Sequence, residues 1–114
     1  LVAPALRAAE QLAREGLDVE VIDPRTLRPL DTETIINSVK KTGRLVVAHE
    51  GWKKWGFGAE VAAVVQEEAF DYLDAPIARV GMRDVPMPYN DTLERIVIPG
   101  QDEVQEAIKA VAYR

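Results

Sequence analysis

A chain of 114 residues has room for one domain with one hydrophobic core. Its 14 basic and 19 acidic side chains give a formal net charge of −5, which disfavours a nucleic-acid binder and mildly favours a basic protein partner. Because the chain has no cysteine, disulfides, zinc–thiolate sites and cysteine nucleophiles are excluded. No apolar run approaches the roughly 18 residues that a membrane span needs, and no signal-peptide pattern is visible, so we expect a cytoplasmic protein.

The first half of the sequence predicts helix, strand, helix and strand in turn. Apolar residues at helical spacing predict a helix over residues 3–15, with Gly16 as its C-terminal cap. The alternating run DVEVID, residues 18–23, predicts a strand. Asp31 is placed to cap a second helix that ends at Gly43. The apolar run RLVVAHE, residues 44–50, is typical of a strand buried on both faces of a parallel sheet.

The second half continues this alternation until a proline-rich stretch. A third helix is predicted over residues 57–73, with Val61, Val65 and Phe70 on its inner side. PIARVG, residues 76–81, predicts a short strand. Residues 83–100 contain three prolines and are expected to be irregular. A last helix is predicted over residues 101–113, with acidic residues in its first turn that suit the helix dipole.

Helices that alternate with buried strands indicate the α/β class, as a three-layer αβα sandwich with a mostly parallel central sheet. All 114 residues fit a single domain of this kind. The sequence opens on a helix, whereas such folds normally begin with a strand inside the sheet. We therefore expect the first strand to lie upstream, in a longer polypeptide of which this is the C-terminal domain.

The chain's only histidine, His49, stands beside Glu50 at the end of a predicted strand, where ligands gather in open α/β sheets. A histidine–glutamate pair is able to transfer protons. The alternative is a structural histidine with a glutamate that caps nearby amides, and we favour it because no second catalytic group is in reach. A metal site is disfavoured, since there is no second histidine and no carboxylate pair with ligand spacing.

The stretch GWKKWGFGAE, residues 51–60, allows two further interpretations. Lys53 and Lys54 beside the Gly56–Gly58 turn and a helix N-terminus suggest an anion site, but the stretch matches neither a Walker loop nor the full dinucleotide fingerprint. The glycines more simply allow the helix to pack closely on the sheet. Exposed tryptophans are typical of protein interfaces, which favours a protein contact at Trp52 and Trp55.

Several segments, in order, resemble a known family. They are residues 8–51, GFGAEVAA, FDYLDAPIARV, DVPMPYNDTLE and the IP before the last helix. Together they are similar to the C-terminal domain of transketolase-like proteins. More narrowly, they resemble the β chain of the thiamine-diphosphate-dependent first component of 2-oxoacid dehydrogenase complexes, of the pyruvate, branched-chain and acetoin types. The order of the motifs is far more specific than any one of them.

The resemblance implies a transketolase C-terminal-domain-like fold and a parent enzyme that decarboxylates a 2-oxoacid, or cleaves acetoin, and passes the acyl group to lipoamide. In that family thiamine diphosphate and magnesium lie between the α chain and the N-terminal half of the β chain. This domain is therefore expected to hold no catalytic, cofactor-binding or metal-binding residue. The variants FDYLDAP and DVPMPYNDTLE incline us towards pyruvate or acetoin as substrate.

The resemblance also implies a role in assembly. In the family this domain supports packing between β chains in an α2β2 heterotetramer, and it offers an acidic surface to the basic subunit-binding domain of the acyltransferase. The matching docking positions are Asp74 of the LDAP motif and, if Arg114 is the natural C-terminus, the carboxylate at Arg114. Neither nucleic acid nor membrane is an expected partner. The residues left for a subunit interface or structural turn are His49, Glu50, Trp52, Trp55, Gly56 and Gly58.

Two alternatives stay open at this stage. One is the C-terminal domain of a transketolase or a deoxyxylulose-phosphate synthase, which would share the fold without the acyltransferase partner. The other is a free-standing flavodoxin-like module that binds an anionic small molecule at Lys53, Lys54 and the Gly56–Gly58 turn.

Overall fold

The computed structural model describes all residues from 1 to 114. None of its helices combines the length and apolar character that a membrane span requires. The elements follow in chain order as α1 (Val2–Arg14), α2 (Thr32–Thr42), β1 (Val46–Trp52), α3 (Phe57–Ala69), the 3-10 turn η1 (Phe70–Tyr72), β2 (Ala78–Met82), α4 (Asp91–Val97) and α5 (Gln101–Val111).

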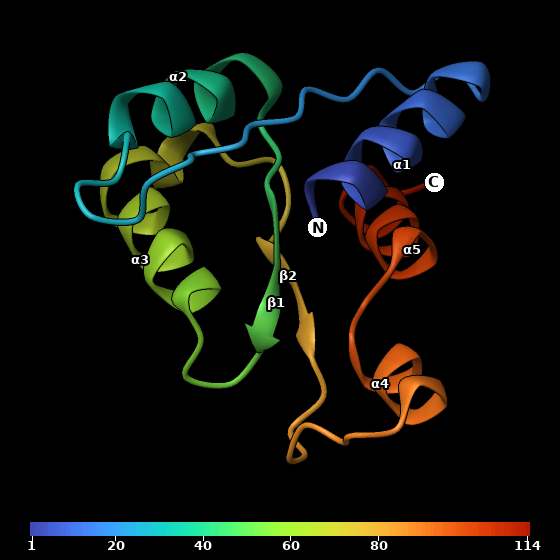
Figure 1. The fold of residues 1–114 in the computed structure, drawn as a ribbon. Coiled ribbons are helices and arrows are strands. Elements are labelled where there is room, and N and C mark those ends of the chain that lie inside the picture. The colour runs from blue at the N-terminus through green and yellow to red at the C-terminus, as the bar shows by residue number, and fades with distance from the viewer.

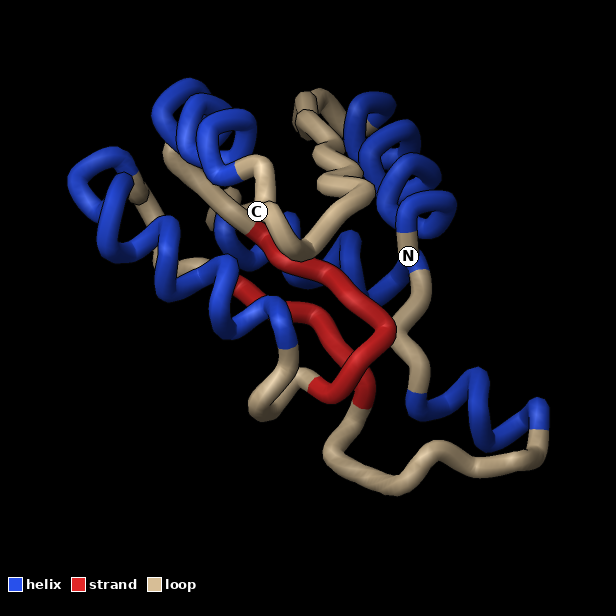
Figure 2. The backbone as a smooth tube through the Cα atoms, turned by 60° about the vertical axis from the view of Figure 1, so that its left-hand side comes forward, coloured by secondary structure: helices blue, strands red, loops and turns tan.

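A two-stranded parallel sheet lies between two pairs of helices. β1 and β2 pair in parallel, with Val46 opposite Ala78 and Ala48 opposite Val80, and α3 connects them. α2 and α3 lie on one side of the strands and α1 and α5 on the other (Figure 1). Figure 2 shows the same arrangement from a second side, with the strands between the helices. The predicted α/β class with helices on both faces of a parallel sheet is confirmed.

Each face of the sheet has its own hydrophobic core. On one face α2 and α3 bury six side chains against one another, and Val47 of β1 and Ile77, the residue before β2, pack on them. On the other face Ala8 of α1, Val80 of β2 and Val104 of α5 form a smaller core. Successive side chains of a strand point to opposite faces, so a strand between two cores has to be apolar at every position.

Three of the helix ends fall on residues that the sequence suggests. Asp31 begins α2, where its side chain accepts a hydrogen bond from the Thr34 backbone N–H at 3.1 Å. The hydrogen bonds from Thr34 also lower the pKa of the Asp31 carboxyl. Gly43 ends α2 with φ 73°, a left-handed conformation that disfavours side chains with a Cβ. At α5 the Glu103 side chain accepts from the Gly100 N–H at 2.8 Å.

The strand predicted over residues 18–23 is wrong. The segment contains no strand and is not paired with either strand of the sheet, although residues 18–21 alternate between exposed and half-buried side chains as a strand would. β-branched residues favour an extended backbone, but a strand also needs a neighbour that accepts its N–H groups, and the chain places none beside this segment.

β1 is less buried than the sequence suggests. Val46, Val47 and Ala48 are half-buried rather than buried on both faces. The sheet has only two strands, so each strand has a hydrogen-bonded neighbour along one edge only. The free edge leaves the strand open to solvent from the side, whatever covers its two faces.

Other helix and strand boundaries differ from the predicted ones by a few residues, and the structure contains one helix that the sequence does not predict. The third helix is α only to Ala69 and continues as η1, and the two strands end at Trp52 and Met82. Within the stretch expected to be irregular, α4 begins where the Asn90 side chain accepts hydrogen bonds from the N–H groups of Thr92 and Leu93. Asn90 is a favourable N-cap residue, but Pro86 and Pro88 come just before it and indicate irregular structure, so the sequence did not predict this helix.

Replacing Leu12 by alanine should lower the free energy of unfolding by about 2–5 kcal/mol, because its side chain is 0% exposed and its loss leaves a cavity. Leu6 lies on the same helix and is 54% exposed, so Leu6→Ala should change stability by less than about 1 kcal/mol. Urea unfolding of the two variants measures both values. Equal losses would mean that α1 is not packed as described.

Candidate functional site

The turn between β1 and α3 is built around His49. We call residues 49–58 the glycine corner. A Cβ atom on Gly56 would lie 2.6 Å from His49 Cε1, and one on Gly58 would lie 2.8 Å from His49 Nε2. Real Cβ atoms do not approach so closely, so no larger residue fits at Gly58 without displacing the ring. At Gly56 a Cβ would lie even closer to the Trp52 carbonyl oxygen, so the backbone would have to move as well. Both glycines therefore leave the room that the imidazole occupies under the first turn of α3.

The imidazole is not arranged as half of a proton-transfer pair. Its Nε2 atom is buried and has no hydrogen-bond partner. Burial, and secondarily the positive charge of Arg79, lower the pKa of His49, which keeps the ring neutral at pH 7. Glu50 lies elsewhere: its side chain is exposed, whereas the imidazole is half-buried. The two neighbouring residues thus do not meet, as expected for adjacent positions on a strand.

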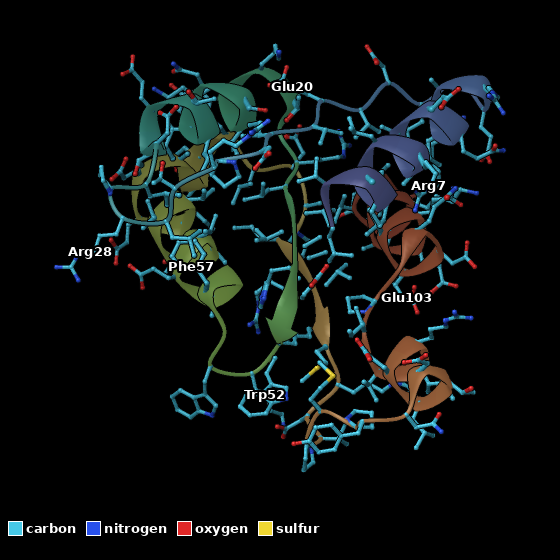
Figure 3. All side chains as sticks on the ribbon, in the orientation of Figure 1. Arg7, Glu20, Arg28, Trp52, Phe57 and Glu103 are labelled. Carbon is cyan, nitrogen blue, oxygen red and sulfur yellow. The ribbon has the colours of Figure 1, made fainter.

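The two tryptophans stand at the outer side of the same corner. Trp52 is 51% exposed, and its Nε1 donates a hydrogen bond to the Val85 carbonyl at 2.9 Å. Figure 3 shows its ring beyond the end of β1. Trp55 is 100% exposed and has φ 60°. Val85, Met87 and Tyr89 are also exposed large hydrophobic residues. Large apolar side chains are therefore gathered at the carboxyl ends of the strands.

The two lysines of the corner have different surroundings. The Nζ atom of Lys54 lies 3.4 Å from the Asp84 carboxylate. Lys53 contributes its backbone carbonyl, which accepts a hydrogen bond from Arg79 Nη1 at 2.8 Å. No group of three or more acidic or histidine side chains is placed to hold a metal ion. The corner therefore packs α3 onto the sheet, and Arg79, which no sequence pattern singles out, secures it from β2.

Asp74, one of the two predicted docking positions, lies beside the side chain of Tyr113 near the end of the sequence. The Tyr113 hydroxyl donates to the Asp74 carbonyl at 3.5 Å across 39 residues of sequence. The Asp74 N–H donates to the Gly43 carbonyl at 2.7 Å. A Cβ on Gly43 would lie 2.3 Å from Asp74 Oδ2, so the carboxylate rests against the C-terminal end of α2. Asp74 is exposed and forms no ion pair.

Residues 1–104 match the family model described as transketolase, C-terminal domain. The chain belongs to this family. Among its relatives is the pyruvate dehydrogenase E1 component subunit beta of Rhizobium meliloti (strain 1021), 52% identical over 110 residues, which are 96% of this chain and 24% of that protein. The Rickettsia felis protein of the same name is 54% identical over 109 residues, 96% of this chain and 33% of the relative.

A eukaryotic relative aligns over the whole of this transketolase C-terminal domain. The mitochondrial pyruvate dehydrogenase E1 component subunit beta of Dictyostelium discoideum is 50% identical over 114 residues, 100% of this chain and 32% of that protein. The chain therefore spans between a quarter and a third of the length of the curated relatives it matches. The family predicted from the ordered motifs is confirmed.

Acidification should destabilise the fold partly through His49. Its pKa is lowered in the folded state, so below its ordinary value of about 6.5 the unfolded chain binds more protons at this position. Stability from His49 is thus complete above about pH 6.5 and is lost as the pH falls to the lowered pKa of the folded state. We expect urea unfolding at pH 7 and pH 5 to show a smaller loss for His49→Gln than for the parent. Equal losses would contradict a buried neutral ring.

The contact between Asp74 and Gly43 should appear as a coupling energy. Gly16→Ala is the control, because Gly16 also has a positive φ, 86°, but a Cβ added there would meet no atom within 4 Å, so strain alone should cost about 1 kcal/mol. Gly43→Ala should cost more, since the Asp74 carboxylate must also turn away. Adding Asp74→Ala should recover the excess over Gly16→Ala in a double-mutant cycle. Strictly additive effects would place the carboxylate elsewhere.

Proposed function

We propose that this chain is the assembly and partner-docking domain of the β subunit of a thiamine-diphosphate-dependent 2-oxoacid dehydrogenase of the pyruvate or acetoin type. The parent enzyme would decarboxylate a 2-oxoacid, or cleave acetoin, and transfer the acyl group to lipoamide. The names of the relatives favour pyruvate. Thiamine diphosphate and magnesium would be held by other parts of the enzyme, in an α2β2 heterotetramer. We also propose a cytoplasmic location; the names of the bacterial relatives specify no organelle.

The observation that carries the docking role is the exposed side chain of Asp74, whose backbone carbonyl accepts a hydrogen bond from the Tyr113 hydroxyl. Asp74 is an exposed carboxylate without a cation, and it rests against the C-terminal end of α2. The helix dipole disfavours negative charge there, so helix electrostatics do not account for an acidic residue at this place. A cationic partner would supply the missing counter-charge, with the carboxylate at Arg114 as a second acceptor. The proposed partner is the basic subunit-binding domain of the acyltransferase.

The assembly role is supported by the glycine corner and its surroundings. A fully exposed Trp55, a half-exposed Trp52 and an exposed Tyr89 near the ends of the strands are the residue types enriched in protein interfaces. We propose that another subunit, a β or an α chain, covers them. The packing of His49 against Gly56 and Gly58 would fix the conformation of the corner beneath this surface. Glu50 would lie at the edge of the interface.

The sheet itself supports a place within a longer subunit. β1 has an unpaired edge, and the extended segment 18–23 has no hydrogen-bonded strand beside it. We propose that one more parallel strand, from a part of the subunit upstream of α1, pairs with β1. Such a strand would satisfy the backbone groups of the open edge.

Asp74→Ala should weaken binding of the subunit-binding domain by about 2–5 kcal/mol, because the partner's buried cation would be left unpaired. The measurement is calorimetry of the assembled α2β2 enzyme against that domain. Asp71→Ala is the matched control, since it removes the same charge from an exposed position three residues away and should leave affinity within about 0.5 kcal/mol. If both variants bind like the parent at low and moderate salt, Asp74 is only a turn residue.

A further inference from the structure

An apolar groove lies between α3 and the outer edge of β2. Its volume is about 630 Å³, and seven of its ten lining residues are hydrophobic. Ala59, Ala62, Ala63 and Phe70 form the wall on the α3 side, and Ile77 and Arg79 belong to the β2 side. No helix of the chain covers this groove: α2 packs on the other flank of α3, and α1 and α5 lie across the sheet.

The α3 wall is shaped to admit side chains from outside. The three alanines and Gln66 recur at i, i+3, i+4 and i+7, which places them on one face of the helix. Their side chains are short, so a second helix could approach closely and insert longer apolar side chains. Phe70 closes one end of this face and is itself 64% exposed, a large apolar surface for a residue that packs on nothing further.

The same wall carries negative charge only. From Phe57 to Ile77 the chain has five acidic residues and no lysine or arginine, and none of the five forms an ion pair: Glu60, Glu67, Glu68, Asp71 and Asp74. Glu60 precedes Ala63 by three residues and Glu67 follows it by four, so both flank the groove. Elsewhere in the domain Glu10, Glu15, Glu20 and Asp23 are paired with lysine or arginine, whereas the stretch from Phe57 to Ile77 offers no basic side chain of its own.

We infer that this groove binds a cationic amphipathic helix, with its apolar stripe against the alanines and Phe70 and its lysines or arginines beside Glu60 and Glu67. The inference rests on the proposed function for the docking of a cationic partner at this end of the domain. It adds an apolar contact that Asp74 does not provide, because the Asp74 carboxylate is turned towards Gly43 while its neighbours Leu73 and Ala75 line the groove.

The negative charge of α3 disfavours a second copy of this chain as the occupant of the groove. Two α3 helices packed on each other would bring acidic residues together with no basic residue of α3 to pair with them. Arg79 is the one cation of the groove, and it is half-buried with its Nη1 donating to the Lys53 carbonyl. A cationic helix meets unpaired carboxylates instead, which steers its approach and fixes its orientation.

The test uses the native assembly that contains this chain and a fluorescein-labelled helical peptide of about 16 residues, long enough for four turns. Its leucines form one stripe and its lysines flank that stripe. Binding is followed by fluorescence anisotropy at low and moderate salt. Ala63→Arg places a long cationic side chain in the groove and should weaken binding about tenfold or more. Ala110→Arg, at an exposed alanine of α5 on the opposite face, is the control and should change affinity less than about twofold.

Charge is tested separately from shape. The double variant Glu60→Gln/Glu67→Gln should weaken binding about threefold to tenfold and reduce its salt dependence. Glu33→Gln/Glu106→Gln removes the same charge from two exposed glutamates without ion pairs, and affinity should stay within about twofold. A peptide with serine in place of leucine should bind about tenfold more weakly, since it lacks the apolar stripe.

Four results would overturn the inference. They are no binding of the peptide to the native assembly, equal binding to Ala63→Arg and Ala110→Arg, equal binding of the leucine and serine peptides, and loss of a subunit contact in Ala63→Arg. The last result would assign the groove to another subunit. Asp74→Ala distinguishes the two proposals: if it abolishes docking of the subunit-binding domain while the groove variants have no effect on either ligand, only the groove is refuted. If Asp74→Ala has no effect and the groove variants weaken the peptide, only the Asp74 docking role is refuted.

Discussion

The parallel pairing of β1 with β2 supports the rest of the domain, because both helix layers pack on these two strands. Val47 and Ile77 point into the core of α2 and α3, whereas Val46, Ala48 and Val80 point into the core of α1 and α5. The two cores share no buried residue. Since two strands cannot enclose themselves, the outer edges of the sheet stay open, and the apolar groove lies along the edge beside β2.

Charge is distributed in the same uneven way. Ion pairs join Lys109 of α5 to Glu15 after α1, and Lys41 of α2 to Glu20 of the extended segment. The pKa values of Glu15 and Glu20 are lowered by the hydrogen bonds from these lysines. The stretch from Phe57 to Ile77 has five acidic residues and no lysine or arginine, whereas the rest of the chain has equal numbers of acidic and basic residues. The net charge of −5 is thus concentrated beside the apolar groove. Neither this charge nor the exposed apolar surface stabilises the folded monomer, and together they are typical of an interaction surface.

Most of the helices could be predicted from the sequence because their signals are local. Asp31 and Gly43 delimit α2, and the spacing of Val61 and Val65 marks the inner face of α3. The strand predicted over residues 18–23 was wrong because pairing depends on a neighbour that no local pattern reveals. The candidate site shows the same difference between local signals and contacts that are distant in sequence. Gly56, Gly58 and His49 are close in sequence and could be linked, but the contact of Tyr113 with Asp74 spans 39 residues, and the role of Arg79 comes from its place on the second strand.

Trp52 and Trp55 are intrinsic fluorescence probes of the glycine corner. These are the only two tryptophans of the chain, and they stand at one end of the sheet, one bonded to the Val85 carbonyl and the other surrounded by solvent. Tryptophan fluorescence, excited at wavelengths that the three tyrosines do not absorb, therefore originates from this single place and does not report directly on α1, α5 or the groove. The emission maximum and the quenching of the two indoles depend on how far solvent reaches them. They would therefore distinguish a glycine corner that another subunit covers from an exposed one, without any label.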